Sequence, residues 1–155
     1  MKTTKNTYEQ SERIIAYWLN RNSLYLLRIS IGIIFLWFGF LKFFPGLSPA
    51  QDLAIDTIAA LTFGLVTPKF IIITLATWET VIGLGFLTGK FQRITLLLLF
   101  MHMLGTFAPM LIFPNEVFTR VPFAPTLEGQ YIIKNIVIIS AGLVIGAKVY
   151  GKQAD

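Results

Sequence analysis

The sequence predicts an all-α fold: an integral membrane four-helix bundle with a short interfacial or re-entrant helix in its first outer loop. Three observations predict it. Hydrophobic residues make up 55% of the 155 residues, and charged residues make up 14%, against roughly 25% in a typical soluble domain. Four apolar segments follow one another, and each has the length of ~20 residues that a helix needs to cross a bilayer. Short stretches that are polar or contain proline and glycine separate these segments.

The chain divides into one transmembrane domain and two short ends. We expect residues 1–22 to be a polar cytoplasmic lead, in which Glu12–Asn20 is either a short amphipathic interfacial helix or a polar tail. Residues 23–150 form the single four-span domain, and residues 151–155 form a cytoplasmic tail. The four spans are expected at residues 23–44, 69–87, 94–113 and 131–150.

A further helix is expected between the first two spans, at residues 50–65. Ser48-Pro49 has the form of a helix start, because proline suits the first helical position. Asp52 and Asp56 lie one turn apart, and the segment is too polar and too short for a span. It therefore either lies at the membrane interface or re-enters between the spans.

The distribution of lysine and arginine predicts the orientation of the chain in the membrane. Loops that stay in the cytoplasm carry an excess of these residues. We therefore expect both termini and the turn at residues 88–93 to be cytoplasmic, in a multi-pass protein of the bacterial inner membrane. The predicted cytoplasmic side carries Lys2, Lys5, Arg13, Arg21, Lys90, Arg93, Lys148 and Lys152, and the other side carries Lys69 and Arg120.

The first span has an unusual stripe. On a helix, Arg28, Gly32, Phe35, Gly39 and Lys42 fall on one face. The two glycines allow a second helix to approach closely. The two cations are costly in a bilayer, so this face is expected to meet partners rather than lipid.

Two ionisable residues are expected near the middle of the membrane. Glu79 and His102 each lie about nine residues from the cytoplasmic end of their spans. Arg28 is the best partner for Glu79 on depth. The group is either a charged cavity that binds an anionic or quinone-like head group or relays protons, or a structural ion pair that fixes helix register.

Lys42, Lys134 and Asn135 lie near the outer ends of the first and fourth spans. Each lysine either snorkels to the interface or joins Asp52, Asp56 and Glu128 in a charged outer mouth. The aromatic side chains of the spans are expected to form a lipid-facing belt or to pack, rather than to hold a ligand. That group includes Trp37, Phe38 and Trp78.

Several functions are disfavoured by composition. The chain has no cysteine, so it carries no disulfide or thiol centre of its own. His102 is the single histidine, which argues against haem and against a metal site. No catalytic triad, phosphate loop or nucleic-acid-binding pattern is visible, so we expect no catalytic residues and no nucleic acid partner. Gly142 and Gly146 form a GxxxG pair, which serves either a homo-oligomer or contacts within the bundle.

Three blocks carry a resemblance to a known family. LRISIGIIFLWFGFLKF at 27–43, WETVIGLGFLTGKFQR at 78–93 and GQYIIKNIVIISAGLVIG at 129–146 resemble the first, second and fourth spans of the DoxX/DoxD-like membrane proteins. The first block is especially similar to the YkgB-type branch. The resemblance implies a four-helix membrane bundle. It also implies polar positions at Arg28, Lys42, Glu79 and Lys134, and packing positions at Gly39 and Gly83.

The resemblance further implies a link to redox chemistry. The family takes its name from a subunit of a thiosulfate:quinone oxidoreductase, and other members are linked to oxidative, thiol or reactive-chlorine stress. We therefore expect a membrane subunit or quinone-interacting partner of a redox or oxidative-stress system, without catalysis of its own and with a separate redox protein as partner. Two other functions stay open: a small-molecule carrier or channel that uses the charged cavity, and a structural membrane scaffold.

Overall fold

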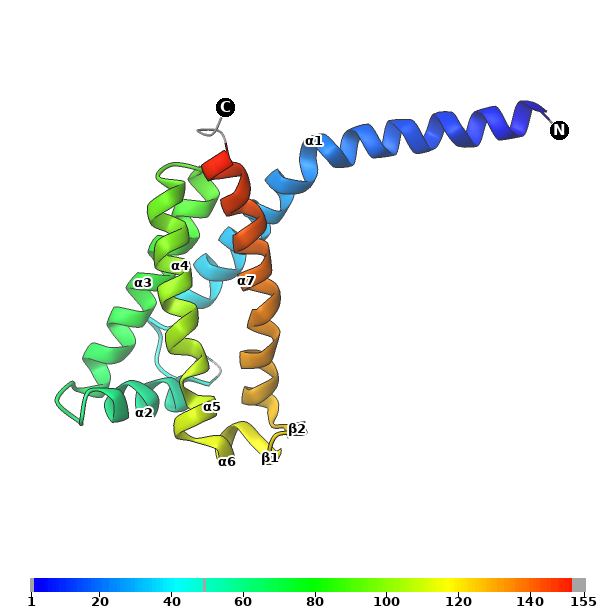
Figure 1. Cartoon of the computed structure of the whole chain (residues 1–155). Helices are drawn as coiled ribbons and strands as arrows, with labels where there is room; N and C mark the ends of the chain where they lie inside the picture. The colour runs from blue at the N-terminus through cyan, green and yellow to red at the C-terminus, as the bar shows by residue number, and fades with distance from the viewer. Residues whose placement is uncertain (1, 49, 152–155) are drawn as a thin grey trace.

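The structure, a computed structural model, describes residues 2–48 and 50–151, with side chains from Glu9 onward (Figure 1). Within these ranges four helical stretches are long and apolar enough to cross a membrane: Glu9–Leu41, Pro68–Thr88, Gln92–Ile112 and Leu127–Gly151. The prediction of an all-α, four-span bundle is confirmed, apart from one short hairpin.

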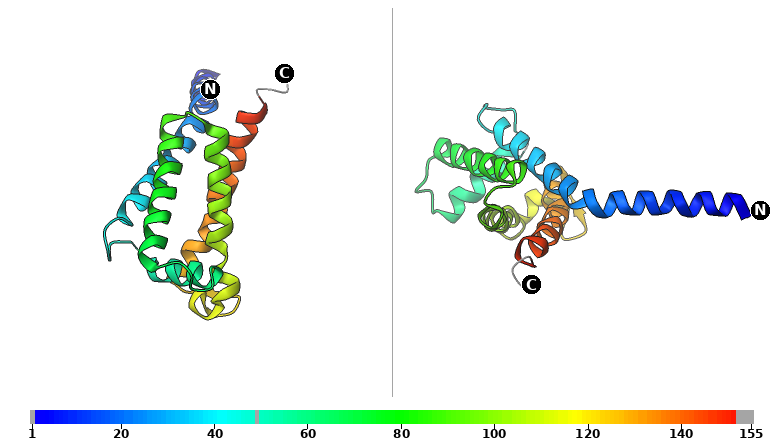
Figure 2. Two further views of the ribbon diagram at one scale, coloured as in Figure 1. Left: turned by 90° about the vertical axis from the view of Figure 1, so that its left-hand side faces the viewer. Right: turned by 90° about the horizontal axis from the view of Figure 1, so that it is seen from above.

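Helix α1 spans Lys2–Leu41 without a break, so the polar lead and the first span form one helix. The reason is local: no glycine or proline precedes Gly32. The N-terminal part of α1 extends away from the other helices, at the end of the bundle where the last described helix ends at Gly151 (Figures 1 and 2). Backbone bonds of the i to i+3 type at Lys42, Phe43 and Phe44 tighten the chain beyond Leu41, before Pro45.

The other spanning helices begin and end at recognisable signals. Helix α3 (Pro68–Thr88) starts with proline at its first position and ends at Gly89, whose φ is 71°. A short turn leads into α4 (Gln92–Phe107), and Pro109 begins the short helix α5 (Pro109–Ile112). Helix α7 (Leu127–Gly151) forms the last span. We call the end with the α3–α4 turn and the end of α7 the turn end, and the opposite end the loop end (Figure 1).

The loop end is closed by helix α2 (Gln51–Leu61), helix α6 (Pro114–Val117) and a hairpin of β1 (Phe118–Arg120) and β2 (Ala124–Pro125). The two strands are antiparallel, with Phe118 opposite Pro125 and Arg120 opposite Ala124. Helix α2 lies across this end of the bundle instead of running along the spans (Figure 1). Leu53, Val117, Phe118 and Ile132 form a buried apolar cluster that joins α2, α6, β1 and α7.

Helices α1 and α3 pack antiparallel and very closely. A Cβ atom on Gly32 would lie 2.8 Å from Cγ of Leu87, and one on Gly39 would lie 2.8 Å from Cβ of Glu79. A Cβ atom on Gly83 would overlap the backbone of Leu36. Small residues at these places let the two backbones approach, as is common between helices in a bilayer.

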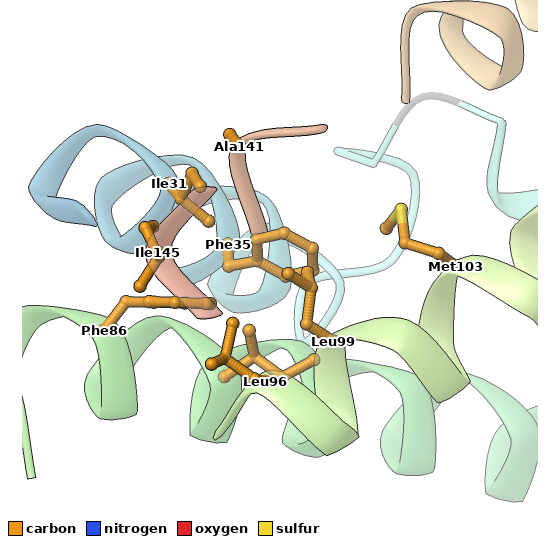
Figure 3. Packing of buried hydrophobic residues seen from close by; sticks show 9 residues of the cluster. Ile31, Phe35, Phe86, Leu96, Leu99, Met103, Ala141 and Ile145 are labelled. Carbon is orange, nitrogen blue, oxygen red and sulfur yellow. The ribbon is translucent and has the colours of Figure 1, made fainter. Parts of the chain in front are cut away.

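The centre of the bundle is apolar and is built by all four spans. Figure 3 shows Phe35 of α1 and Phe86 of α3 beside Leu96 and Leu99 of α4. Ala141 and Ile145 of α7 belong to the same cluster. A Cβ atom on Gly142 would lie 2.9 Å from Cδ2 of Leu99, whereas one on Gly146 would make an ordinary 3.7 Å contact with Leu96. Both glycines of the GxxxG pair therefore face α4 of the same chain.

Large apolar side chains also cover the outside of the spans. Leu104 and Val137 are 77% and 71% exposed, and Trp37 is 65% exposed. A soluble protein does not display such a continuous apolar surface. The exposed apolar surface and the four spans together identify a multi-pass membrane protein.

Candidate functional site

A buried carboxylate lies at the centre of the candidate site. Glu79 is in the middle of α3 and is only 7% exposed. Its Oε2 accepts a hydrogen bond from Nζ of Lys42 at 2.7 Å, and its Oε1 lies 3.3 Å from Nε2 of His102. We call Lys42, Glu79 and His102 the Glu79 cluster.

The packing of the helices explains why these three residues meet. Gly39 lies directly against the Cβ of Glu79, so the end of α1 is held at the middle of α3. Lys42 follows three residues later, in the turn that ends α1. His102 reaches the cluster from α4, where the ring of Phe35 contacts it edge-on with centroids 5.6 Å apart.

The Glu79 cluster is largely buried. The side chains of Lys42, Glu79 and His102 are 10–12% exposed. An unpaired charge at this depth is expensive, and pairing offsets most of that cost. The ammonium and the carboxylate cancel, so the cluster is polar but close to neutral.

The Glu79 cluster forms one wall of a cavity of about 410 Å³. This volume is within the range of small-molecule sites, which is roughly 300–1,000 Å³. Most of the lining is apolar and comes from α1, α2, α3, α4 and α7. Examples are Phe38, Ile58, Leu75 and Ile138. An apolar cavity with a few polar groups on one wall is the usual form of a ligand site.

Helix α2 contributes to the wall of the cavity at the loop end. Leu53, Thr57 and Ile58 line it. The Thr57 hydroxyl donates to the Leu53 carbonyl at 2.6 Å, so it is already used within the helix. The contribution of α2 could not be seen in the sequence, because its amphipathic pattern does not say what it packs against.

Trp78 and Asn135 also line the cavity. Trp78 donates from Nε1 to the Leu98 carbonyl at 3.1 Å, which fixes its ring between α3 and α4. Of the two expectations for Trp78, a lipid-facing belt or packing, the structure shows packing, and the residue also lines the cavity. Phe38 lines the cavity too, whereas Trp37 is largely exposed. Asn135 extends the polar part of the wall onto α7, and Glu128 contributes a carboxylate nearer the loop end.

Arg28 does not pair with Glu79, which corrects the predicted pair. Its Nη1 donates to the carbonyl of Phe86 at 2.8 Å, close to the end of α3. The antiparallel packing of α1 on α3 sets this position. Arg28 and Gly39 are eleven residues apart, or about 16 Å along a helix, so Arg28 lies far from Glu79. At the end of α3 its charge is favourable, because helix carbonyl ends carry partial negative charge.

Lys134 is a second correction. It is exposed on α7 and is not part of the cavity wall. Lys42 turns inward to Glu79, so the predicted outer mouth shared by Lys42 and Lys134 does not form. Asp52 and Asp56 are exposed on α2. The sequence contained one usable signal for the true pair: Gly32 and Gly39 are seven residues apart on α1, and Ala76 and Gly83 repeat this spacing on α3.

The Glu79 cluster offers hydrogen-bonding groups in a largely apolar setting. Across residues 2–48 and 50–151, no group of three histidine, aspartate or glutamate side chains could hold a metal ion. The cavity lining includes an ammonium, an imidazole, two carboxylates and an amide, together with an indole. These groups suit a ligand with a polar head and an apolar body.

Comparison with known proteins identifies one family. The sequence model of the DoxX family matches residues 23–113, more than half of the chain. The match includes all three residues of the Glu79 cluster. No curated protein and no solved structure matches the chain.

Proposed function

The chain belongs to the DoxX family, and we propose that it binds a quinone-like molecule in the cavity beside the Glu79 cluster. The ligand would be neutral and lipophilic, with carbonyl or hydroxyl oxygens at one end. The protein would then serve as the membrane subunit or quinone-interacting partner of a redox or oxidative-stress system.

The observation that carries the proposal is the hydrogen-bonding capacity of Lys42. An ammonium group has three donors. Among the described residues, Nζ of Lys42 has one acceptor, Oε2 of Glu79, although the residue lines the cavity. A ligand carbonyl beside Nζ would accept a charge-assisted hydrogen bond, which is stronger than a neutral one.

The charge of the cavity favours a neutral ligand over an anion. The positive charge of Lys42 is balanced by Glu79 at 2.7 Å, and Glu128 adds another carboxylate to the lining. A small anion such as thiosulfate would have to leave water for a largely apolar space without a net positive field, which is costly. A quinone head group accepts hydrogen bonds without bringing a charge.

The chain contains no cysteine, so in this proposal it brings no thiol redox centre of its own. Electrons would come from a separate redox protein. The chain would hold the quinone head, exclude water from it, and provide His102 and Glu79 for proton exchange. We further propose that the turn end faces the cytoplasm of a bacterial inner membrane, because lysines and arginines concentrate there.

The direct experiment is extraction of the purified protein. The chain would be purified in a mild detergent from quinone-producing bacteria, and bound lipids would be identified by mass spectrometry. We expect about one quinone per chain in the wild type and a clear loss in Lys42→Met/Glu79→Gln, which removes the polar pair without leaving a lone charge. Lys134→Met is the matched control, because it removes an exposed lysine outside the cavity. A wild type without quinone would contradict the proposal.

A carrier function would use the same cavity, and the same preparation separates the two. Reconstituted vesicles would accumulate a substrate through the wild type and lose uptake with Glu79→Gln. If the protein carries no quinone but supports such uptake, the carrier function would be favoured over quinone binding. Quinone-free protein without uptake would favour the scaffold.

A further inference from the structure

A second pocket lies at the turn end, on the opposite side of the bundle core from the cavity. It has a volume of about 440 Å³ and is lined by α1, the α3–α4 turn and α7. Three cationic residues line it: Arg21, Arg28 and Lys148. This pocket shares no lining residue with the cavity of the Glu79 cluster.

The three cations have no acidic partner within the described part of the chain. The ion pairs in that part are those of Glu79 with Lys42 and with His102. Arg21 contacts the hydroxyl of Tyr17 at 3.5 Å, which leaves its charge unbalanced. The pocket therefore has a net positive charge, unlike the nearly neutral cavity.

Arg28 is held in place within this pocket. Its guanidinium donates to the Phe86 carbonyl, lies 5.3 Å from the centre of the Tyr25 ring, and rests against Gly89. A guanidinium has five N–H donors, so one bond to a carbonyl leaves several available. A fixed arginine with free donors is suited to bind phosphate oxygens.

The same pocket has an apolar side. Leu24, Ile145 and Val149 line it together with the cations. These side chains come from α1 and α7, on segments that span the membrane. Cationic and apolar groups in one pocket at the end of a membrane bundle match an amphiphile, with its charged head at the cations and its chains along the helices.

We propose that this pocket binds the head-group phosphate of an anionic glycerophospholipid. The phosphate would be held by Arg28 together with Arg21 and Lys148, and the first part of an acyl chain would lie on Leu24 and Val149. Basic pockets between transmembrane helices are known to hold anionic lipid head groups on the side where such lipids are enriched. The turn end carries most of the loop lysines and arginines, consistent with that side. This inference is independent of the proposed quinone site.

Native mass spectrometry of the full chain in detergent tests the proposal. The probes are phosphatidylglycerol and phosphatidylcholine with identical acyl chains. The variant is Arg21→Gln/Lys148→Gln, which removes two exposed cations and keeps Arg28. The control is Arg13→Gln/Lys90→Gln, which removes two exposed cations from the same end outside the pocket. Equal unfolding temperatures would show that both variants are folded.

We expect the wild type to bind phosphatidylglycerol at least about tenfold more tightly than phosphatidylcholine, since each nearby cation contributes measurably to anionic lipid binding. The pocket variant should lose most of this preference, and the control should keep it within about twofold. Equal affinities in the wild type, or an equal loss in both variants, would overturn the proposal. Displacement of the lipid by millimolar glycerol 3-phosphate would assign the pocket to soluble phosphate esters instead.

Discussion

Lys42 and Glu79 are 37 residues apart in the chain, yet Nζ of the first lies 2.7 Å from Oε2 of the second. The pair connects the end of the first span to the middle of the second. Gly39 lies against the Cβ of Glu79 beside it, so helix packing and ion pairing fix the same register. His102 adds the third span to the same point.

The first prediction concerns the energy of this pair. Lys42→Met leaves a buried carboxylate without its cation and is expected to destabilise the bundle by about 3 kcal/mol. Adding Glu79→Gln should restore part of the loss, with a coupling energy of about 1–2 kcal/mol. Unfolding in mixed micelles with increasing SDS measures the four stabilities of the cycle.

Lys134→Met is the control for that cycle. The lysine is exposed and lies outside the cavity, so its replacement should change stability by no more than about 0.5 kcal/mol. Additive effects of Lys42→Met and Glu79→Gln would show that the two side chains do not interact.

The second prediction concerns the contact between α1 and α3. Gly39→Ala and Gly83→Ala each introduce a Cβ atom that would overlap the facing helix, so each should cost about 1–3 kcal/mol. Gly146→Ala places its Cβ atom 3.7 Å from Leu96, an ordinary contact, and should be nearly neutral. The same SDS titration compares the three, and equal stabilities would argue against the close packing.

The third prediction separates backbone strain from a lost contact at Gly89. Gly64 and Gly89 have φ values of 72° and 71°, a conformation that costs alanine about 1 kcal/mol. Gly64 has open space around it, whereas a Cβ atom on Gly89 would displace Arg28. Gly89→Ala should therefore destabilise the protein more than Gly64→Ala. The difference should vanish in an Arg28→Gln background, and its persistence there would count against the contact.

The fourth prediction concerns topology, and the absence of cysteine makes it simple to test. Leu65, which precedes α3, is 85% exposed, and Lys90 follows α3. The test uses the two single variants Leu65→Cys and Lys90→Cys. A membrane-impermeant maleimide should label Leu65→Cys in cells with a permeable outer membrane, and should label Lys90→Cys only after lysis. Labelling of both in intact cells would contradict a spanning α3, and the reverse pattern would invert the orientation.

The spans could be predicted from the sequence because hydrophobic length alone decides which segments can cross a bilayer. Pro68 and Gly89 also marked the bounds of α3 closely. The boundary expected between the polar lead at 1–22 and the first span at 23–44 does not appear as an end of a helix, because nothing in Lys2–Leu41 interrupts a helix before Gly32.

The candidate site was harder to predict, because it depends on how helices face each other. Glu79 and His102 stood out as polar residues in apolar spans, and both lie in the cluster. The partner of Glu79 could not be chosen by depth alone. Counting from the membrane surface treats each helix separately, whereas the glycine contacts between α1 and α3 set the register and select Lys42 over Arg28.

Binding of a quinone head group beside Lys42 can be followed directly by the fluorescence of Trp78, which lines the cavity. In a Trp18→Phe/Trp37→Phe background, Trp78 is the single tryptophan, and quinones quench indole emission at short range. Titration with a short-chain ubiquinone analogue should quench it saturably, and Lys42→Met/Glu79→Gln should weaken the apparent affinity about tenfold or more, as expected for a lost charge-assisted hydrogen bond. Lys134→Met should titrate like the parent. Linear, non-saturating quenching in the parent, or equal affinity in all three proteins, would show that no quinone head group binds beside Lys42.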